Sequence, residues 1–433
     1  MSFILSILIS IWAIIRTWWW VLLPIILWRP FKFLWLFWGN DRFSKGEGKN
    51  ILLEIKMPAE VDRPFKAMEQ VYAGLWMLYD PADFYEKWIE VKYDASMSIE
   101  IVSIEGSIHF YLRFPEKARN LIESSIYSQY PEVEIIEAED YTQNVPKNIP
   151  NKKWDLWGTD YEFIKKDIYP IKTYPNFFEE RAVQYETERI DPLAALLEGL
   201  NKTGPGEQIW VQFKIKPVTV AEDDYIKRAD TEISKLVNRP GEKKNPFLIK
   251  QAADVVLLGQ LPNGSQEDQK ENYFLPPEMK LTPGERDIVS GIEHKISKIM
   301  FKGHLRFIIL GERDKWNKGN LRNILGYFAN FNTQNLNAFK PWSKSLTKIH
   351  KNEKLFLNMF FHKTLVFYKK RKLLKRYIQR LRFTYPKKDM EFILNIEELA
   401  SLFHFVGRSA VPAPSITRVE AKKSEPPVNL PGE

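Results

Sequence analysis

The sequence predicts an α+β protein in which an N-terminal membrane helix precedes two units of the order βαββαβ. Residues 3–28 contain a single ionisable side chain, Arg16. Several later segments alternate apolar and polar residues with the period of a strand, and the segments between them space apolar residues as amphipathic helices do. A chain of 433 residues is also long enough to form more than one hydrophobic core.

The first forty residues predict a membrane anchor over 1–40. A helix rising about 1.5 Å per residue would cover roughly 39 Å over 3–28, enough to cross a bilayer with some tilt. Indole rings favour the headgroup boundary, so their density fits a membrane segment. Seven of the 14 tryptophans lie here, namely Trp12, Trp18, Trp19, Trp20, Trp28, Trp35 and Trp38. An interfacial segment and a buried helix stay open as alternatives, because Arg16 and Pro24 disfavour a straight span.

The charges around this apolar run set its predicted orientation. Basic residues follow the run and none precedes it; they are Arg29, Lys32, Arg42, Lys45 and Lys49. Lys and Arg are enriched in the cytoplasmic segments that flank membrane helices. We therefore expect the rest of the chain to face the cytoplasm from the inner membrane.

Residues 50–144 predict the first domain, with a ferredoxin-like fold. The segments ILLEIKM, SMSIEIVSI, SIHFYLRF and VEIIEAEDY read as strands, and two helical segments separate them in the order βαββαβ. In SIHFYLRF, Phe110 belongs to the apolar row and His109 to the polar row. The pair Glu105-Gly106 between two strands is typical of a hairpin turn.

Residues 160–345 predict a second ferredoxin-like domain, after a connector at 145–175. The helix DPLAALLEGLNK is followed by the strand EQIWVQFKIKP, but the partner strand HLRFIILG comes about ninety residues later. We therefore expect a long helical insertion at 218–300 within the central hairpin. Spaced apolar residues predict the second helix of this unit; they are Leu321, Ile324, Leu325 and Phe328.

The C-terminal part is predicted to form a basic helix and a capping helix within 350–410, followed by an extended, proline-rich tail at 411–433. The helix over 362–383 has an apolar seam of Leu373, Leu374, Tyr377, Ile378 and Leu381. Its eight candidate anion-binding residues are Lys369, Lys370, Arg371, Lys372, Lys375, Arg376, Arg380 and Arg382. Two tyrosines, Tyr368 and Tyr377, could stack on the bases of a single strand.

The charge distribution leaves three roles open for this basic helix. Residues 301–390 hold 22 Lys and Arg against 4 Asp and Glu, whereas acidic residues are in excess over 51–300. A basic helix can dock on an acidic face of its own chain, bind the phosphates of a nucleic acid, or bind anionic lipid or a partner protein.

No catalytic constellation is found in the sequence. The chain has no cysteine, which excludes thiolate metal sites and cysteine nucleophiles. The pair Gly48-Lys49 lacks the remaining residues of a phosphate-binding loop, and the six histidines lack metal-ligand spacing. We therefore expect a protein that is not an enzyme and has no cofactor or metal; a hydrolase with its site in the insertion is the remaining catalytic alternative.

Several stretches carry a family resemblance. They are TWWWVLLPIILWRPFKFLWLFW, ILLEIKMPAEVDRPFKAMEQVYAGLW, and SIEIVSIEGSIHFYLRFP with IYSQYPEVEIIEAEDY. Together they resemble an uncharacterised family of membrane-anchored bacterial proteins associated with conjugation-like, type IV secretion ATPases. The ending, LNIEELASLFHF with PAPSITRVEAKKSEPPVNLP, is similar to the segment that leads into a HerA/FtsK-like motor in fused members. The resemblance implies an accessory module whose motor is a separate polypeptide.

Two functional hypotheses follow. The first is a membrane-anchored, non-enzymatic adaptor that positions a separate P-loop ATPase of a secretion or DNA-transfer system at the cytoplasmic membrane face. The second is a membrane-tethered nucleic-acid-binding protein that acts through the basic helix. The expected partners are accordingly a lipid bilayer, the separate ATPase, nucleic acid and further copies of the chain.

Overall fold

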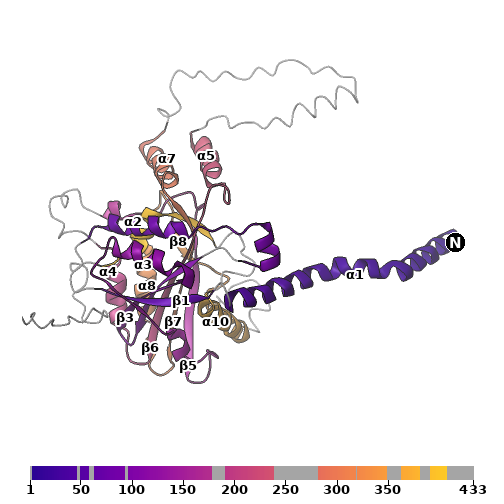
Figure 1. The fold of residues 1–433 in the computed structure, drawn as a ribbon, viewed down its shortest axis with the longest axis horizontal. Helices are drawn as coiled ribbons and strands as arrows, with labels where there is room; N and C mark the ends of the chain where they lie inside the picture. Colours follow the sequence, from indigo (N-terminus) through magenta and orange to yellow (C-terminus); the bar gives the residue numbers. More distant parts are fainter. Residues whose placement is uncertain are drawn as a thin grey trace, which may run out of the picture.

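A single antiparallel sheet organises the described part of the chain (Figure 1). This computed structural model describes residues 2–45, 49–57, 63–92, 96–177, 191–237, 281–317, 319–348, 362–380 and 391–406. The sheet has nine strands in the order β4-β1-β3-β2-β6-β7-β5-β8, with β9 paired to β7. The chain is therefore α+β, as the sequence predicts.

The first half of the sheet is a split βαβ unit. Its strands are β1 (Asn50–Lys56), β2 (Met97–Ile104), β3 (Ser107–Pro115) and β4 (Glu134–Glu137), and its helices are α2 (Phe65–Leu75) and α3 (Arg119–Tyr127). They follow one another as βαββαβ. The turn between β2 and β3 places Glu105 at φ 54° and Gly106 at φ 94°, so the Glu-Gly hairpin signal is confirmed.

The second half repeats this arrangement. Its elements are β5 (Trp154–Phe163), α4 (Ala194–Asn201), β6 (Glu207–Pro217), β7 (Met300–Glu312), α8 (Asn320–Ala329) and β8 (Phe339–Pro341). The order β8-β5-β7-β6 matches β4-β1-β3-β2 position for position. The strand β5 falls in the stretch predicted to be a connector. Its sequence, WDLWGTDYEF, lacks the regular alternation of apolar and polar residues that identified other strands.

The two units are joined edge to edge by β2 and β6. Their antiparallel pairing runs from Met97 opposite Ile215 to Ile104 opposite Gln208. One buried apolar cluster then extends across both units on the face that the unit helices cover. The two units therefore share one sheet and one core instead of forming separate domains, which corrects the predicted architecture.

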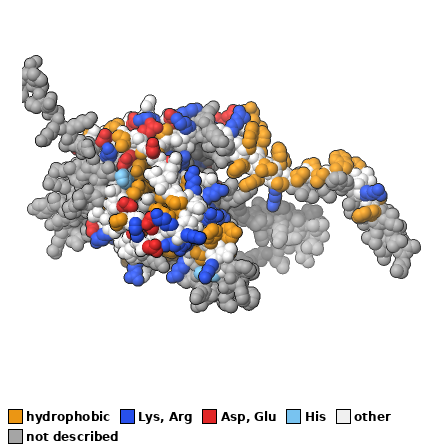
Figure 2. Space-filling view, turned by 90° about the horizontal axis from the view of Figure 1, so that it is seen from below, with side chains coloured by type: hydrophobic (Ala, Val, Ile, Leu, Met, Phe, Trp, Pro, Cys, Tyr) orange, Lys and Arg blue, Asp and Glu red, His pale blue; other side chains and the backbone are white. Residues whose placement is uncertain are grey.

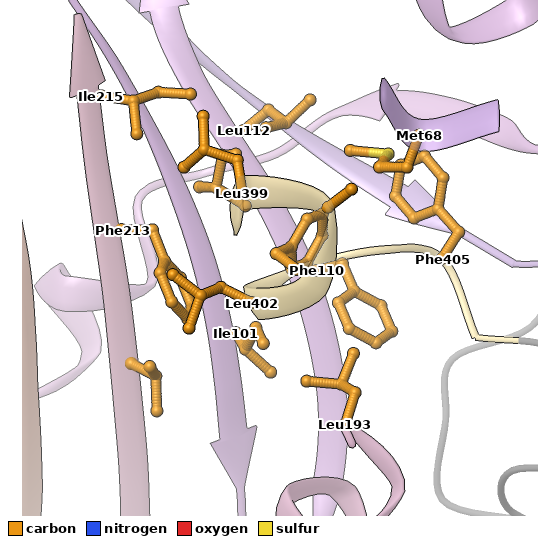
Figure 3. Close-up of a cluster of buried hydrophobic side chains, with 14 of the residues drawn as sticks. Met68, Ile101, Phe110, Leu112, Leu193, Phe213, Ile215, Leu399, Leu402 and Phe405 are labelled. Atoms are coloured by element: carbon orange, nitrogen blue, oxygen red, sulfur yellow. The ribbon is translucent and has the colours of Figure 1, made fainter. Parts of the chain in front are cut away.

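The C-terminal helix fills the space between the helices of the two units. β9 (Phe392–Asn395) pairs with β7 and leads into α11 (Ile396–Leu402), whose predicted capping box, Asn395 with Glu398, is present. Leu399 and Leu402 are buried against both units (Figure 3).

Two tyrosines fasten the end of α11. Tyr72 of α2 donates a hydrogen bond to the carbonyl oxygen of Phe403 at 3.2 Å, and Tyr327 of α8 donates one to the carbonyl oxygen of Leu402. All four residues are buried. Because α2 belongs to the first unit and α8 to the second, α11 connects the two.

The predicted insertion begins and ends with helices. α5 (Tyr225–Leu236) and α7 (Pro283–Ile296) lie side by side at one end of the sheet (Figure 1). A fully buried ion pair joins α7 to α11, with Lys295 Nζ 3.0 Å from Glu398 Oε2. The middle of the insertion, 238–280, and the proline-rich tail lie outside the described residues.

Short helical turns complete the described part of the fold: η1 (Trp76–Leu78), η2 (Glu86–Glu90), η3 (Glu116–Ala118), η4 (Tyr141–Asn144) and η5 (Tyr174–Phe177).

The N-terminal helix, α1 (Ser2–Lys45), projects from the sheet with the N-terminus at its far end (Figure 1). Its C-terminal part contacts η2 and the residues beside it. Trp35 Nε1 donates to the carbonyl oxygen of Trp88 at 2.8 Å, and Lys32 Nζ lies 4.4 Å from the centre of the Trp88 ring. Among the described residues, no helix combines the length and the apolar character needed to cross a bilayer. The predicted spanning anchor and the inner-membrane location derived from it are therefore wrong.

The aromatic residues that suggested an anchor are mostly exposed on α1. The exposed fractions are 54–67% for Trp12, Trp18, Trp20, Trp28 and Trp38. Arg16 is also exposed and Trp35 is half-buried, while the Trp19 side chain lies outside what the structure describes. An indole carries a polar N–H and prefers a boundary to hydrocarbon. Aromatic density is therefore a poor measure of the apolarity that a span requires.

We predict that Leu402→Ala destabilises both units together. Leu402 is fully buried, and removing its side chain should lower the free energy of unfolding by about 2–5 kcal/mol. Urea unfolding followed by circular dichroism should show one transition at a lower midpoint. Leu27→Ala on α1 is the matched control, since Leu27 is 52% exposed and its loss should change little. Two separate transitions in the Leu402 variant would contradict the shared core.

Candidate functional site

The basic helix α10 (His362–Ile378) lies on the sheet face opposite the helices of the two units (Figure 1). Leu373, Leu374 and Tyr377 are buried and pack on a second apolar cluster that includes Trp210. Gly158 of β5 permits this approach. A Cβ atom there would lie 2.9 Å from Leu373 Cδ2 and 2.4 Å from a backbone oxygen of β7.

The end of α10 is fixed by an ion pair between Arg380 and Glu100. Arg380 Nε lies 2.9 Å from Glu100 Oε1, and Arg380 Nη2 lies 3.0 Å from Glu100 Oε2. Three further side chains donate to this buried carboxylate; they are Ser98, Tyr141 and Gln212. Arg380 also bonds Asp140, and it adopts a left-handed conformation at φ 48°. The stabilisation from these buried ion pairs therefore outweighs the energetic cost of a backbone conformation that arginine rarely adopts.

Electrostatics favour the charged forms of this pair. Burial alone would raise the pKa of Glu100, but the charge and hydrogen bonds of Arg380 outweigh burial and lower it. Burial alone would lower the pKa of Arg380, and Glu100 raises it far above the usual range. Glu100 is fully buried and Arg380 almost so, which makes each the necessary partner of the other.

A second buried carboxylate, Asp160, lies near the last turn of α10. His304 Nε2 lies 3.1 Å and Arg306 Nε 3.2 Å from Asp160 Oδ1, and Arg376 Nη1 of α10 lies 3.9 Å from Asp160 Oδ2. Burial would raise the pKa of Asp160, but the charge of Arg306, the contact with His304 and the charge of Arg376 outweigh burial and lower this pKa to about 2. Arg376 therefore faces a fixed negative charge.

Two more lysines of α10 contact the protein. Lys370 Nζ lies 2.6 Å from Asp155 Oδ1 of β5, and Lys369 Nζ donates to the carbonyl oxygen of Ser343 at 3.3 Å. Together with Arg376 and Arg380, these residues form the inward side of α10. Docking on an acidic face of the same chain therefore accounts for the cations on the inward side of the basic helix.

The exposed surface of α10 carries no acidic residue. We call it the solvent face, and its members are Lys363, Thr364, Phe367, Tyr368, Arg371, Lys372 and Lys375. Among the described carboxylates, none pairs with Lys363, Lys372 or Lys375, and Arg371 lies 5.0 Å above the Phe367 ring. Lys and Arg side chains gather on the side of the body near the root of α1 (Figure 2).

The structure divides the eight predicted anion-binding residues between these two sides. Arg371, Lys372 and Lys375 belong to the solvent face, and Arg382 lies outside the described residues. The other four lie on the inward side. Tyr377, a predicted stacking residue, is buried with its hydroxyl 2.9 Å from that of Tyr141, so no base can reach it. Lys363 and Phe367 were missed, although four-residue spacing from Arg371 could have found them.

Comparisons with protein-family models and with curated proteins identify no relative of this chain. A scan against protein-family models finds no match, and no curated protein is similar to the chain at a significant level. The resemblance to secretion-associated proteins and the separate ATPase partner therefore stay predictions. Within the described residues, no group of three or more His, Asp or Glu side chains is placed to bind a metal ion.

We predict that Arg380→Met strongly destabilises the protein. The variant leaves the Glu100 carboxylate buried without its cation, and breaking a buried pair costs about 3–5 kcal/mol. Chemical unfolding measures the loss. Lys375→Met is the matched control on the same helix, because Lys375 is exposed and the change should stay below about 0.5 kcal/mol. Equal effects of the two substitutions would contradict the docking of α10.

We also predict a stability loss in mild acid that depends on His304. Burial, followed by the charge of Arg306, lowers the pKa of His304, so the folded protein keeps the ring neutral. The unfolded chain protonates it below about pH 6.5, and the free energy of unfolding should therefore fall from pH 7 to pH 5.5. Urea titrations at several pH values measure this slope. It should be smaller in His304→Gln, and an unchanged slope would contradict the assignment.

Proposed function

We propose that this chain is a non-enzymatic nucleic-acid-binding protein whose contact surface is the solvent face of α10. The observation that supports this proposal is the division of the basic helix into two sides. The inward cations meet Asp155, Asp160 and Glu100, while Lys363, Lys372 and Lys375 point to solvent without a described carboxylate.

Self-docking does not account for the solvent face. A helix that only needs solubility carries charges of both signs on its outer side, since mixed charges avoid a large field of one sign. The sequence of α10, HKTLVFYKKRKLLKRYI, contains no acidic residue. The face therefore keeps a positive field that attracts phosphates.

The dimensions of the solvent face suit a phosphate backbone. Lys363 and Lys375 are twelve residues apart, which is about 3.3 turns and about 18 Å along a helix. Cations spread over this length can contact more than one phosphate. The helix is also held rigidly, because its apolar seam and three ion pairs fix its rotation on the sheet. On binding, the lysine side chains must become ordered but the helix itself need not, which keeps the entropic cost of binding low.

The triple variant Lys363→Gln, Lys372→Gln, Lys375→Gln tests the proposal. We expect weaker binding of a labelled oligonucleotide, measured by fluorescence anisotropy over a range of salt concentrations. Each phosphate contact contributes about 0.7 to the salt slope on a single strand and about 0.9 on duplex DNA, so the slope should fall by roughly 2–3. Thermal stability should be unchanged, because the three side chains are exposed.

A matched triple variant separates this surface from net charge. Lys66 and Lys227 are exposed on α2 and α5, and Lys202 is exposed at the C-cap of α4, all away from α10; changing them to Gln removes the same charge. Binding should be nearly unaffected. If both triple variants lose binding equally, attraction is unspecific, and if the unmodified protein binds neither DNA nor RNA, the proposed function is wrong.

A further inference from the structure

Two aromatic rings interrupt the cations of the solvent face. Tyr368 is 64% exposed and Phe367 is 36% exposed, and their ring centres are 5.9 Å apart at an interplanar angle of 83°. Burying such rings would contribute to stability, yet here the core contacts are made by Leu373, Leu374 and Tyr377 instead. Within the described residues, this aromatic pair therefore takes no part in the buried contacts of α10.

The neighbours of the pair provide charge on both sides. Lys363 precedes Phe367 by four residues, and Arg371 and Lys372 follow Phe367 and Tyr368 by four. Residues four apart lie on the same side of a helix, so each ring has a cation one turn away. A site with rings between cations can bind a ligand that has both flat apolar surfaces and negative charges.

A single-stranded nucleic acid fits both requirements. Its unpaired bases offer their faces for stacking on tyrosine or phenylalanine, and its phosphates lie between them. In a duplex the base faces are already stacked on one another, and only the phosphates and groove edges remain accessible. The aromatic pair would therefore add to binding of a single strand and contribute little to binding of a duplex.

We propose that the solvent face of α10 binds single-stranded nucleic acid in preference to duplex, with bases stacking on Tyr368 and Phe367. This inference rests on the proposed function, because the phosphates contact the same lysines. Stacking does not depend on base identity, so we expect the site to tolerate sequence changes. The 2′-hydroxyl of RNA is not needed for stacking, so DNA and RNA strands share the chemistry that is recognised.

Binding of the full chain to three labelled probes tests the inference. The probes are a 20-nucleotide dT strand, a 20-nucleotide U strand and a 20-base-pair duplex, compared by fluorescence anisotropy at the same salt concentration. We expect at least about tenfold tighter binding of either single strand. Tyr368→Ala should weaken single-strand binding by roughly 5- to 150-fold, the range for loss of one stacked base, and leave duplex binding nearly unchanged. Tyr368→Phe keeps the ring and should retain most of the preference.

The controls separate failure of this inference from failure of the proposed function. Lys372→Gln should weaken single-strand and duplex binding alike, because it removes a phosphate contact. If all probes bind but Tyr368→Ala leaves the ratio of the affinities unchanged, the single-strand inference is wrong and the proposed function stands. If vesicles of anionic lipid bind with the same dependence on Tyr368 and no probe binds, both proposals are wrong. Unchanged thermal unfolding of each variant shows that its fold is intact.

Discussion

The pairing of β2 with β6 is the constraint on which the rest of the structure depends. It joins the edge strands of two βαββαβ units into one sheet, and it leaves a space between the helices of the two units on the covered face. α11 occupies that space, fastened by a tyrosine from each unit. The pairing of β2 with β6 also places polar residues on the opposite face of the sheet, where α10 docks. Glu100 of β2 lies directly opposite Gln212 of β6, and this polar pair receives the end of α10 through Arg380.

The buried carboxylates beneath α10 fix the rotation of this helix on the sheet. Removing a carboxylate from water is expensive, and the pairing recovers that cost only when the partner is well placed. Glu100 meets this condition through five hydrogen bonds, and Asp155 and Asp160 receive cations from earlier turns of the helix. Any other rotation of α10 would separate Arg380 from Glu100, Lys370 from Asp155 and Arg376 from Asp160. The pairs therefore determine which lysines and aromatic rings point to solvent, and the contact surface follows from interactions on the buried side.

Local patterns predicted the elements well wherever one face of an element is polar. Alternation identified β3 and β6, and the capping signature at Asn395 identified the start of α11. The strand β5 was missed because its sequence, WDLWGTDYEF, lacks a regular alternation of apolar and polar residues. The membrane anchor was predicted from tryptophan density, which overestimates apolarity. The division of the basic helix could not be predicted, since Arg380 and Glu100 are 280 residues apart in the sequence. Only the folded sheet determines which cations face inward.

The architecture also explains why the candidate interface lies on this face. In a split βαβ unit both helices cover the same side of the sheet, so two units joined edge to edge leave a wide opposite side. Polar residues of the strands point to that side, among them Glu100, Gln212 and Arg306. A helix that covers them must supply complementary charge, and α10 does so with its inward arginines. A helix selected for inward cations needs no cations outside, so the outer row of lysines beside exposed rings requires a separate cause. We propose that this cause is contact with a polyanion that has flat, unpaired bases.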